Sequence, residues 1–228
     1  MCTALRRVAL FALLAAGLWI ATAAHGQWVF YPTDDTFIAE RQPGENYGYA
    51  DYLSVRNREG ATPGWERDTL LKFDLSIIPP GTPITLATLS IYYYRWGDNN
   101  PSGRVLSCHR ALHDWEEHKL TWSYWHSWGH PCAPEPTASA VVPNQYGWMT
   151  WDVTVDVQAF VAGTPNFGWE IRDLAPFGGY NIPITDFYSK ESGSLRPYLT
   201  VVPEPSALAW LTTAGVLVAH ARRPSRTR

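Results

Sequence analysis

Residues 87–96 read ATLSIYYYRW, a run in which apolar and more polar side chains alternate. Successive side chains of a β-strand point to opposite faces, so Leu89, Ile91 and Tyr93 share one face and the intervening residues share the other. The run therefore predicts a strand with one buried face. Eight further runs, rich in Val, Ile, Tyr, Trp and Thr and separated by Gly, Pro and Asn, also predict strands: residues 28–31, 52–56, 69–74, 104–110, 147–153, 168–172, 184–188 and 198–202.

Many short strands with turn residues between them predict an all-β fold, and we expect a β-sandwich of the jelly-roll type. One segment has a different period. Val157, Phe160 and Val161 recur at the spacing of a helix, with Thr154 as a capping residue before them and Gly163 after them. We therefore expect one short helix, packed over one end of the sandwich.

The charge of the chain is unevenly distributed. The 228 residues carry a formal net charge of −3, but residues 27–200 hold 12 Lys and Arg against 20 Asp and Glu, a net charge of −8. A nucleic-acid-binding surface needs basic residues that neutralise phosphates, so we expect no nucleic-acid partner. The length suits one domain with a substantial core.

Residues 1–26 predict a secretory signal peptide that signal peptidase removes. Arg6 and Arg7 precede an apolar run from Val8 to Ile20, and small residues follow as far as Gly26. An uncleaved membrane anchor is the alternative interpretation. The run is short for a membrane span, which needs about 20 apolar residues, so cleavage is favoured.

Residues 203–228 form a second sorting segment with three parts. Pro203-Glu204-Pro205 is followed by an apolar stretch over residues 207–221 and then by an arginine-rich tail. This arrangement resembles the PEP-CTERM sorting signal of Gram-negative bacteria. The resemblance implies recognition by an exosortase, transient anchoring in the inner membrane by a hydrophobic helix, and secretion to the cell surface. An ordinary C-terminal anchor and a helix packed on the core are the alternatives.

Export also bears on the cysteines. Cys2 leaves with the signal peptide, so the exported chain keeps Cys108 and Cys132. An even pair of cysteines in an oxidising compartment usually closes. We therefore expect a disulfide between these two residues, with two free buried thiols as the alternative.

Short motifs stand in one order along most of residues 30–202. They are Asp35-Thr36-Phe37-Ile38, Asn46-Tyr47-Gly48, Leu70-Leu71-Lys72-Phe73-Asp74-Leu75-Ser76 with Ile78-Pro79, Ala87-Thr88-Leu89, Trp115-Glu116-Glu117, Leu120-Thr121-Trp122, Asp152-Val153-Thr154 with Val157-Gln158, Asn166-Phe167-Gly168-Trp169, Ser189-Lys190-Glu191 and Arg196-Pro197-Tyr198-Leu199.

This ordered set resembles the DNRLRE family, also called disaggregatase-related domains. The resemblance implies a single β-sandwich domain over residues 27–202, similar to carbohydrate-binding modules. Some members accompany enzymes that act on acidic polysaccharides such as alginate, and others are surface or matrix proteins. The Trp- and Pro-rich segment 124–143 departs from the family pattern.

No catalytic motif stands out. The paired carboxylates Asp34-Asp35 and Glu116-Glu117 are adjacent in sequence, whereas a glycosidase needs two carboxyl groups placed across the scissile bond. GxSxG, HExxH and P-loop motifs are absent from the sequence. We expect a protein that is not an enzyme, with a small polysaccharide lyase or hydrolase as the alternative.

Two sets of residues bear on metal binding. A structural calcium ion could use the oxygen-rich residues Asp34, Asp35, Glu40, Glu45, Asn46 and Asp51. Five histidines gather between residues 109 and 130. His109 and His113 lie about 13 Å apart on a strand, which is too far to share an ion, and the pattern does not place His126 and His130.

Aromatic side chains are the best indication of function, because sugar rings stack on flat indole and phenol rings. Tyr124, Trp125 and Trp128 lie in the departing segment and are expected to be exposed. Further expected ligand-binding residues are Trp65 and Trp96 beside turns, and Arg67 and Arg95, which would bind an anionic glycan.

The sequence as a whole predicts an exported surface or matrix protein with a non-catalytic domain that binds a neutral or uronate polysaccharide. A purely structural surface protein that packs against copies of itself is the main alternative. An apolar patch without a groove would favour that alternative.

Overall fold

The computed structural model describes residues 26–57, 64–175 and 182–205. The expected signal peptide, apart from Gly26, lies outside the described residues, as do the apolar stretch and arginine tail at the C-terminal end. None of the helices in the described ranges is long and apolar enough to cross a membrane.

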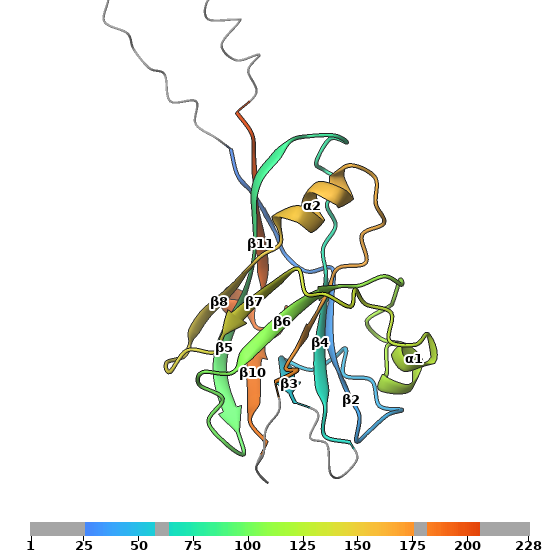
Figure 1. The fold of residues 1–228 in the computed structure, drawn as a ribbon, viewed down its shortest axis with the longest axis vertical. Helices are drawn as coiled ribbons and strands as arrows, with labels where there is room; N and C mark the ends of the chain where they lie inside the picture. Colours follow the sequence, from blue (N-terminus) through green and yellow to red (C-terminus); the bar gives the residue numbers. More distant parts are fainter. Residues whose placement is uncertain (1–25, 58–63, 176–181, 206–228) are drawn as a thin grey trace, which may run out of the picture. The chain divides into compact units, whose positions relative to one another are not determined.

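Eleven antiparallel strands form the framework of the described residues (Figure 1). They are β1 (Trp28–Phe30), β2 (Asp34–Ala39), β3 (Tyr52–Arg56), β4 (Arg67–Lys72), β5 (Ile84–Gly97), β6 (Val105–Arg110), β7 (Ala138–Val141), β8 (Gly147–Asp152), β9 (Trp169–Arg172), β10 (Ile184–Tyr188) and β11 (Tyr198–Pro203). Three helical segments join them: α1 (Trp122–Ser127), α2 (Thr154–Val161) and a 3-10 turn over Gly193–Leu195.

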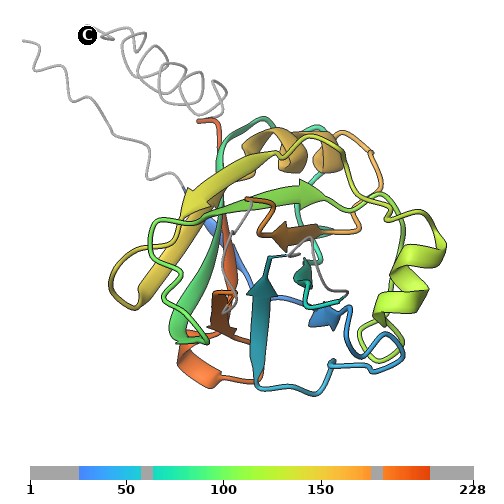
Figure 2. The same cartoon turned by 60° about the horizontal axis from the view of Figure 1, so that its bottom comes forward.

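The strands form one curled sheet, shown from two sides in Figures 1 and 2. Its path runs β1-β11-β5-β10-β3-β4-β9-β6-β7, with β8 added to β5 and β2 added to β4. We call β1, β3, β5, β8, β10 and β11 the β5 half, and β2, β4, β6, β7 and β9 the β4 half. The two halves join at a single residue pair, Arg56 with Arg67. The predicted all-β class is confirmed. The expected sandwich would have two separate sheets, whereas here backbone pairing connects both halves into one curled sheet.

The main core lies between the two halves of the curled sheet. The predicted inner face of residues 87–96 is confirmed, because Leu89, Ile91 and Tyr93 are almost completely buried. From the other half, Trp169 and Ile171 of β9 belong to the same hydrophobic cluster. The alternation along β5 is thus the result of one face meeting this core.

A second, smaller hydrophobic cluster covers the outer face of the β4 half. Ile38 and Leu70 of the sheet contact Trp115, Leu120 and Trp125, which come from the segment that includes α1. Strands β2 and β4 are therefore buried on both faces, which accounts for the nearly continuous burial along them.

Helix α2 confirms the expected helix, but the sequence predicts Thr154 as a cap in the position before the helix. Thr154 is its first residue, and the carboxylate of Asp152 accepts the Thr154 backbone N–H at 3.0 Å. The sequence pattern does not predict helix α1. Its cap is Thr121, whose hydroxyl accepts the Tyr124 N–H at 3.2 Å.

The predicted disulfide is wrong, since Cys108 and Cys132 are both free. Cys108 points from β6 into the main core. Cys132 forms a backbone bridge with Ala111, and its sulfur lies within 4.8 Å of a Glu170 carboxylate oxygen on the outer face of the β4 half. The two side chains lie on opposite faces of the sheet, so their sulfur atoms cannot meet.

A free pair of thiols gives a direct prediction. The full chain, unfolded in denaturant without a reductant, should alkylate at Cys2, Cys108 and Cys132, and mass spectrometry should count three added groups. Prior reduction should leave this count unchanged. A count that rises by two after reduction would instead establish the disulfide.

Candidate functional site

Aromatic side chains gather on the outer face of the β5 half. They come from alternate strand positions whose neighbours, such as Tyr93 and Phe187, are buried in the core. Each is partly exposed, and the exposed fraction of Trp148 is 39%. We call this set the aromatic face: Tyr52 of β3, Tyr92 and Tyr94 of β5, Trp148 of β8, and Tyr188 of β10.

Four of these rings form a row across three neighbouring strands. Tyr94 and Tyr188 stack with centroids 4.1 Å apart and planes at 8°. Tyr92 lies 5.8 Å from Tyr188 and meets Trp148 edge to face at 5.2 Å. Because each ring is held by its neighbour, the row loses little conformational entropy when a ligand settles on it.

A β-bulge places an arginine beside this row. Tyr93 pairs with Phe187, but the next pair is Arg95 with Asp186, so Tyr94 is the additional residue on β5. Strict alternation would point Arg95 toward the core, as it does Tyr93. The bulge turns Arg95 to the outer face, next to Tyr94.

Asp186 fixes the orientation of the Arg95 guanidinium. Its Oδ2 accepts from Nε and lies 2.9 Å from Nη2, while its Oδ1 accepts from the Ser54 hydroxyl at 2.8 Å. Arg67 donates to the same hydroxyl at 3.2 Å. Two arginines from different strands are therefore linked through Ser54 and Asp186, and the Arg95 side chain remains 53% exposed.

A groove of about 580 Å³ runs along one end of the row. The guanidinium carbon of Arg95 lies over the rings of Tyr52 and Tyr94, 5.3 Å from each centroid. Apolar rings with a few polar groups around them are typical of ligand-binding grooves. The lining residues are Asp51, Tyr52, Tyr94, Arg95, Tyr188, Glu191, Ser192, Ser194 and Leu195.

Tyr94 and Arg95 keep their ordinary charges at neutral pH. Burial raises the pKa of Tyr94, against the opposing charge of Arg95, so the phenol stays protonated. Burial alone would lower the pKa of Arg95, but the hydrogen bond and charge of Asp186 raise it. The groove therefore offers a phenol hydroxyl and a permanent cation to a ligand.

Comparison with known families decides the class of this protein. The family model for carbohydrate-binding module family 96 matches residues 27–203. The chain belongs to that family. The match confirms the carbohydrate-binding module that the motifs implied, while the search of curated proteins gave no match.

The module brings together some of the residues predicted to bind a ligand. Arg67 and Arg95 are linked through Ser54 and Asp186, and of the two arginines only Arg95 lines the groove. Trp96 is 41% exposed but pairs with the buried Thr185, which places it on the opposite face from Arg95. Trp65 is half-buried, and its ring lies near two guanidinium carbons, those of Arg41 at 4.2 Å and Arg56 at 4.6 Å. Those arginines occupy the surface that a sugar would need.

The predicted aromatic residues of α1 divide into two kinds. Tyr124 and Trp128 are 42% and 53% exposed, as expected, and Trp128 stacks on His113 at 4.1 Å. They lie beside a smaller groove of about 240 Å³, which Tyr124 and His113 help to line. Figures 1 and 2 place α1 away from β5 and β10, so this groove is separate from the aromatic face.

The expected exposure of Trp125 is wrong. Its side chain is completely buried in the second hydrophobic cluster, and its indole N–H donates to Glu170 Oε1 at 3.1 Å. Successive side chains of a helix are turned by about 100°, so Trp125 faces the sheet while its neighbour Tyr124 faces outward. Trp125 is a core residue of the module.

Burial of this indole predicts a loss of stability. Replacing Trp125 with alanine should lower the free energy of unfolding by about 3–5 kcal/mol, because it leaves a large cavity and removes a partner of Glu170. Urea denaturation followed by circular dichroism would measure the change. Trp128→Ala, which truncates an exposed ring on the same segment, should cost less than about 1 kcal/mol. Equal losses would contradict the assignment.

The tyrosines of the aromatic face do not stand out in the sequence. Tyr is a common strand former, so Tyr52, Tyr92 and Tyr188 resemble ordinary residues of predicted strands. The useful signal is the position of Tyr92 and Tyr94 in the 87–96 run, because both lie on the face opposite the predicted buried face. The residues next to Tyr92 and Tyr94 in the sequence do not indicate which strands pair with this one in the sheet.

A second groove, of about 610 Å³, lies between the end of β4 and α2 and is mainly apolar. Leu75, Ile78 and Phe160 line it and are more than nine-tenths buried. Such residues present no exposed ring face for a sugar. The aromatic face is therefore the better candidate site.

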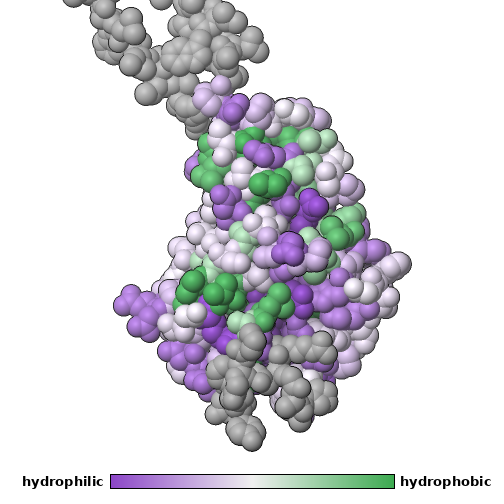
Figure 3. Space-filling model, in the orientation of Figure 1, coloured by the Kyte–Doolittle hydropathy of each residue, from purple (hydrophilic) through white to green (hydrophobic). Residues whose placement is uncertain are grey.

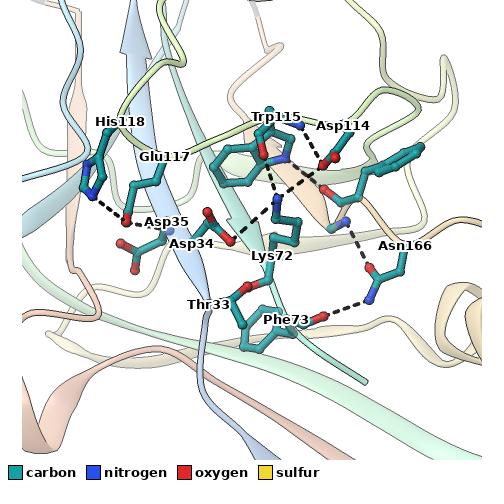
Figure 4. A network of polar contacts seen from close by, with 12 residues as sticks. Thr33, Asp34, Asp35, Lys72, Phe73, Asp114, Trp115, Glu117, His118 and Asn166 are labelled. Carbon is teal, nitrogen blue, oxygen red and sulfur yellow. Dashed lines mark hydrogen bonds and ion pairs between the residues drawn. The ribbon is translucent and has the colours of Figure 1, made fainter. Parts of the chain in front are cut away.

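Polar contacts around Lys72 explain the acidic residues near β2 (Figure 4). The Lys72 ammonium donates to Asp114 at 3.2 Å and to the Trp115 carbonyl at 2.6 Å, and it lies 3.6 Å from Asp34. Asn166 donates to the Phe73 carbonyl at 2.8 Å in the same view. These contacts hold the segment around residue 115 against the sheet, which is a structural role.

The residues expected to hold calcium do not converge as one set. Asn46 donates to the carbonyls of Glu117 and Leu120, both at 2.7 Å, and Asp35 groups with Glu117 and Glu191. Burial, followed by the charge of Glu191, raises the pKa of Asp35 well above its usual value. The Lys190 ammonium lies 3.1 Å from Glu117 and 2.7 Å from Glu191. A structural calcium ion held by the acidic and amide side chains between Asp34 and Asp51 stays a prediction.

The surface bears on the alternative of self-assembly. The face of the module drawn in Figure 3 shows hydrophobic residues in separate spots among hydrophilic ones. A broad apolar patch of the kind that drives obligate association is not seen on that face.

Proposed function

We propose that this protein is an exported, non-catalytic module that binds a polysaccharide across the aromatic face. The single observation that carries the proposal is the row of stacked rings at Tyr188 with the fixed guanidinium of Arg95 at its end. Rings hold the apolar faces of sugars, and a fixed cation and nearby hydroxyls orient the sugar oxygens. Membership of a carbohydrate-binding module family supports this assignment.

The charges around the groove favour a neutral polysaccharide over a uronate. Asp186 already balances Arg95, and Lys190 already pairs with Glu191. Asp51 adds a further negative charge to the groove. Carboxylates accept hydrogen bonds from sugar hydroxyls and repel sugar carboxylates, so we infer that hydroxyl-rich neutral chains bind more tightly.

Replacement of Arg95 separates these two ligand classes. Arg95→Lys keeps the charge but loses the planar fork that binds a carboxylate. We expect a neutral glycan to lose less than about threefold in affinity, and a uronate ligand to lose about tenfold or more, since hydrogen bonds to charged groups contribute about 1.5–3 kcal/mol. Calorimetric titration of both proteins would measure the difference. Equal losses for both glycans would contradict a carboxylate contact at Arg95.

Export and sorting belong to the proposal as well. The signal-like residues 1–26 and the Pro203-Glu204-Pro205 segment support secretion, processing by signal peptidase and an exosortase, and final placement at the surface of a Gram-negative cell. Glu204 donates its backbone N–H to the Pro83 carbonyl at 2.8 Å, so the proposed sorting motif begins directly beside the sheet. The DNRLRE resemblance supports a surface or matrix role.

The proposal is tested by titrating the full chain with a panel of neutral and uronate polysaccharides. Tryptophan fluorescence and calorimetry would report binding, and chromatography of the glycans would report any products. We expect saturable binding to a neutral polysaccharide without new reducing ends or unsaturated uronates. A chain that binds none of the panel would refute the proposal, and new products would make it an enzyme.

A further inference from the structure

A group of metal-ligating side chains lies outside the aromatic face, on the outer side of the β4 half. Glu170 projects from β9 away from the main core, while its neighbours Trp169 and Ile171 point into it. The segment after α1 brings His130 and Cys132 over this carboxylate. The group therefore joins two stretches of chain that are distant in sequence.

The ligand atoms of these three residues lie close together. One atom each from His130, Cys132 and Glu170 falls within 4.8 Å of the other two. His130 Nε2 is 2.8 Å from Glu170 Oε2. Ligands of a tetrahedral zinc ion, each bound at about 2.0–2.3 Å, are separated by roughly 3.3–3.8 Å. A small outward movement of these side chains would therefore admit an ion.

Buried negative charge surrounds the group. Glu66, Asp68 and Glu170 each have an exposed fraction of 2% or less. Arg172 forms ion pairs with Glu66 at 2.8 Å and with Asp68 at 3.6 Å. Neither carboxylate oxygen of Asp68 has a hydrogen-bond partner among the described residues. Three buried carboxyl groups beside one guanidinium form a site in which a divalent cation would stabilise the ionised carboxylates.

We propose that His130, Cys132 and Glu170 bind a zinc ion. Imidazole nitrogen, thiolate sulfur and carboxylate oxygen are the three ligand types that zinc takes in proteins, and three of them with an open fourth position form a complete site. The ring of His126 lies 4.7 Å from that of His130, so water or His126 completes the coordination. His126, His130 and Cys132 all lie in the segment that departs from the DNRLRE pattern, so this site is a property of this chain.

Neighbouring contacts already orient the proposed ligands. The Trp125 indole donates to Glu170 Oε1 and leaves Oε2 to face His130. Gly129 and His130 have φ values of 75° and 60°, a left-handed turn that brings the imidazole back over the sheet. Hydrogen bonds of this kind to metal ligands fix their direction and raise affinity. Metal binding converts the thiol of Cys132 to a thiolate and releases its proton.

Cobalt provides the direct test, because a thiolate bound to Co²⁺ gives a charge-transfer absorption band. The full chain, without an affinity tag and in reduced form, would be titrated with Co²⁺ and then with Zn²⁺. We expect the band to saturate at one Co²⁺ per chain, to disappear when Zn²⁺ displaces it, and to be accompanied by proton release. A chain that gives no thiolate band with Co²⁺ overturns the proposal.

Variants assign the ligands. Cys132→Ser should abolish the band, and Glu170→Gln should weaken Co²⁺ binding by about 10-fold or more. His130→Asn should weaken it similarly, and asparagine tolerates the left-handed backbone at this position. The matched control is the double variant Cys2→Ser with Cys108→Ala, which removes the other two thiols and should keep the band. A band that survives Cys132→Ser, or is lost in the control, overturns the assignment.

A measurement on the unsubstituted chain guards against variants that fail to fold. Zn²⁺ should raise the midpoint of thermal unfolding of the full chain, and the shift should grow with Zn²⁺ concentration. The same addition to folded Cys132→Ser, verified by circular dichroism, should give no shift. Equal shifts in both proteins would show that zinc acts elsewhere and would refute the site.

Discussion

Tyr188→Ala should weaken polysaccharide binding by about 30-fold or more. Tyr188 stacks on Tyr94 and also contacts Tyr92, so its removal takes away one ring surface and the support of two others. Truncation of an aromatic residue at the centre of a binding surface typically costs about 2 kcal/mol or more, which corresponds to this factor. Calorimetric titration with the best glycan of the panel would measure it.

Two controls make this experiment specific. Tyr188→Phe keeps the ring and should retain most of the affinity if stacking dominates. Tyr124→Ala removes an exposed tyrosine from α1, at the other groove, and should bind as the unsubstituted chain does. If Tyr124→Ala loses binding while Tyr188→Ala keeps it, the glycan site lies at α1, and the aromatic face has another role.

Gly168→Ala should be the most destabilising small substitution in the module. Gly168 has a φ of +77°, and an added Cβ would overlap the Leu71 carbonyl oxygen and lie 2.8 Å from Lys72 Cα. Both obstacles are backbone atoms at the end of β4, so they cannot rotate away. We expect the free energy of unfolding to fall by about 4 kcal/mol or more, the size that breaking a packed element produces.

Gly81→Ala is the matched control for this clash. Gly81 has nearly the same backbone conformation, with a φ of +74°, but an added Cβ there meets no atom within 4 Å. The left-handed conformation alone should cost about 1–2 kcal/mol. Urea denaturation of both variants separates the two effects. If both variants lose a similar free energy of unfolding, the close contact of Gly168 with the β4 backbone is not the reason for glycine at this position.

Local periodicity is enough to predict several elements of this fold. The run over residues 87–96 predicts the strand β5 and its buried face, and the spacing of Val157, Phe160 and Val161 predicts α2. Collinear motifs imply a carbohydrate-binding module, which the family match confirms. These inferences succeed because side-chain direction repeats every two residues in a strand and every 3.6 in a helix, whatever the rest of the chain does.

The same reasoning fails where partners are distant. The sequence predicts Trp125 in a loop, but a capped helical turn directs it into a cluster over β4. The even number of exported cysteines predicts a bond between Cys108 and Cys132, while the strand geometry sends them to opposite faces. The burial of Trp125 and the separation of the two cysteines do not follow from neighbouring residues. Both depend on how the segment after β6 packs on the outer face of the β4 half.

The candidate site is likewise decided by tertiary structure. The sequence by itself determined that the chain is β-rich and belongs among carbohydrate-binding modules. It also predicted exposed aromatic and arginine residues, wrongly for Trp125. Only the folded sheet placed Tyr188 against Tyr94 and, through the bulge at Tyr94, turned Arg95 from the core to the outer face. A bulge is set by the pairing of β5 with β10, two strands far apart in the chain, and no local period records it.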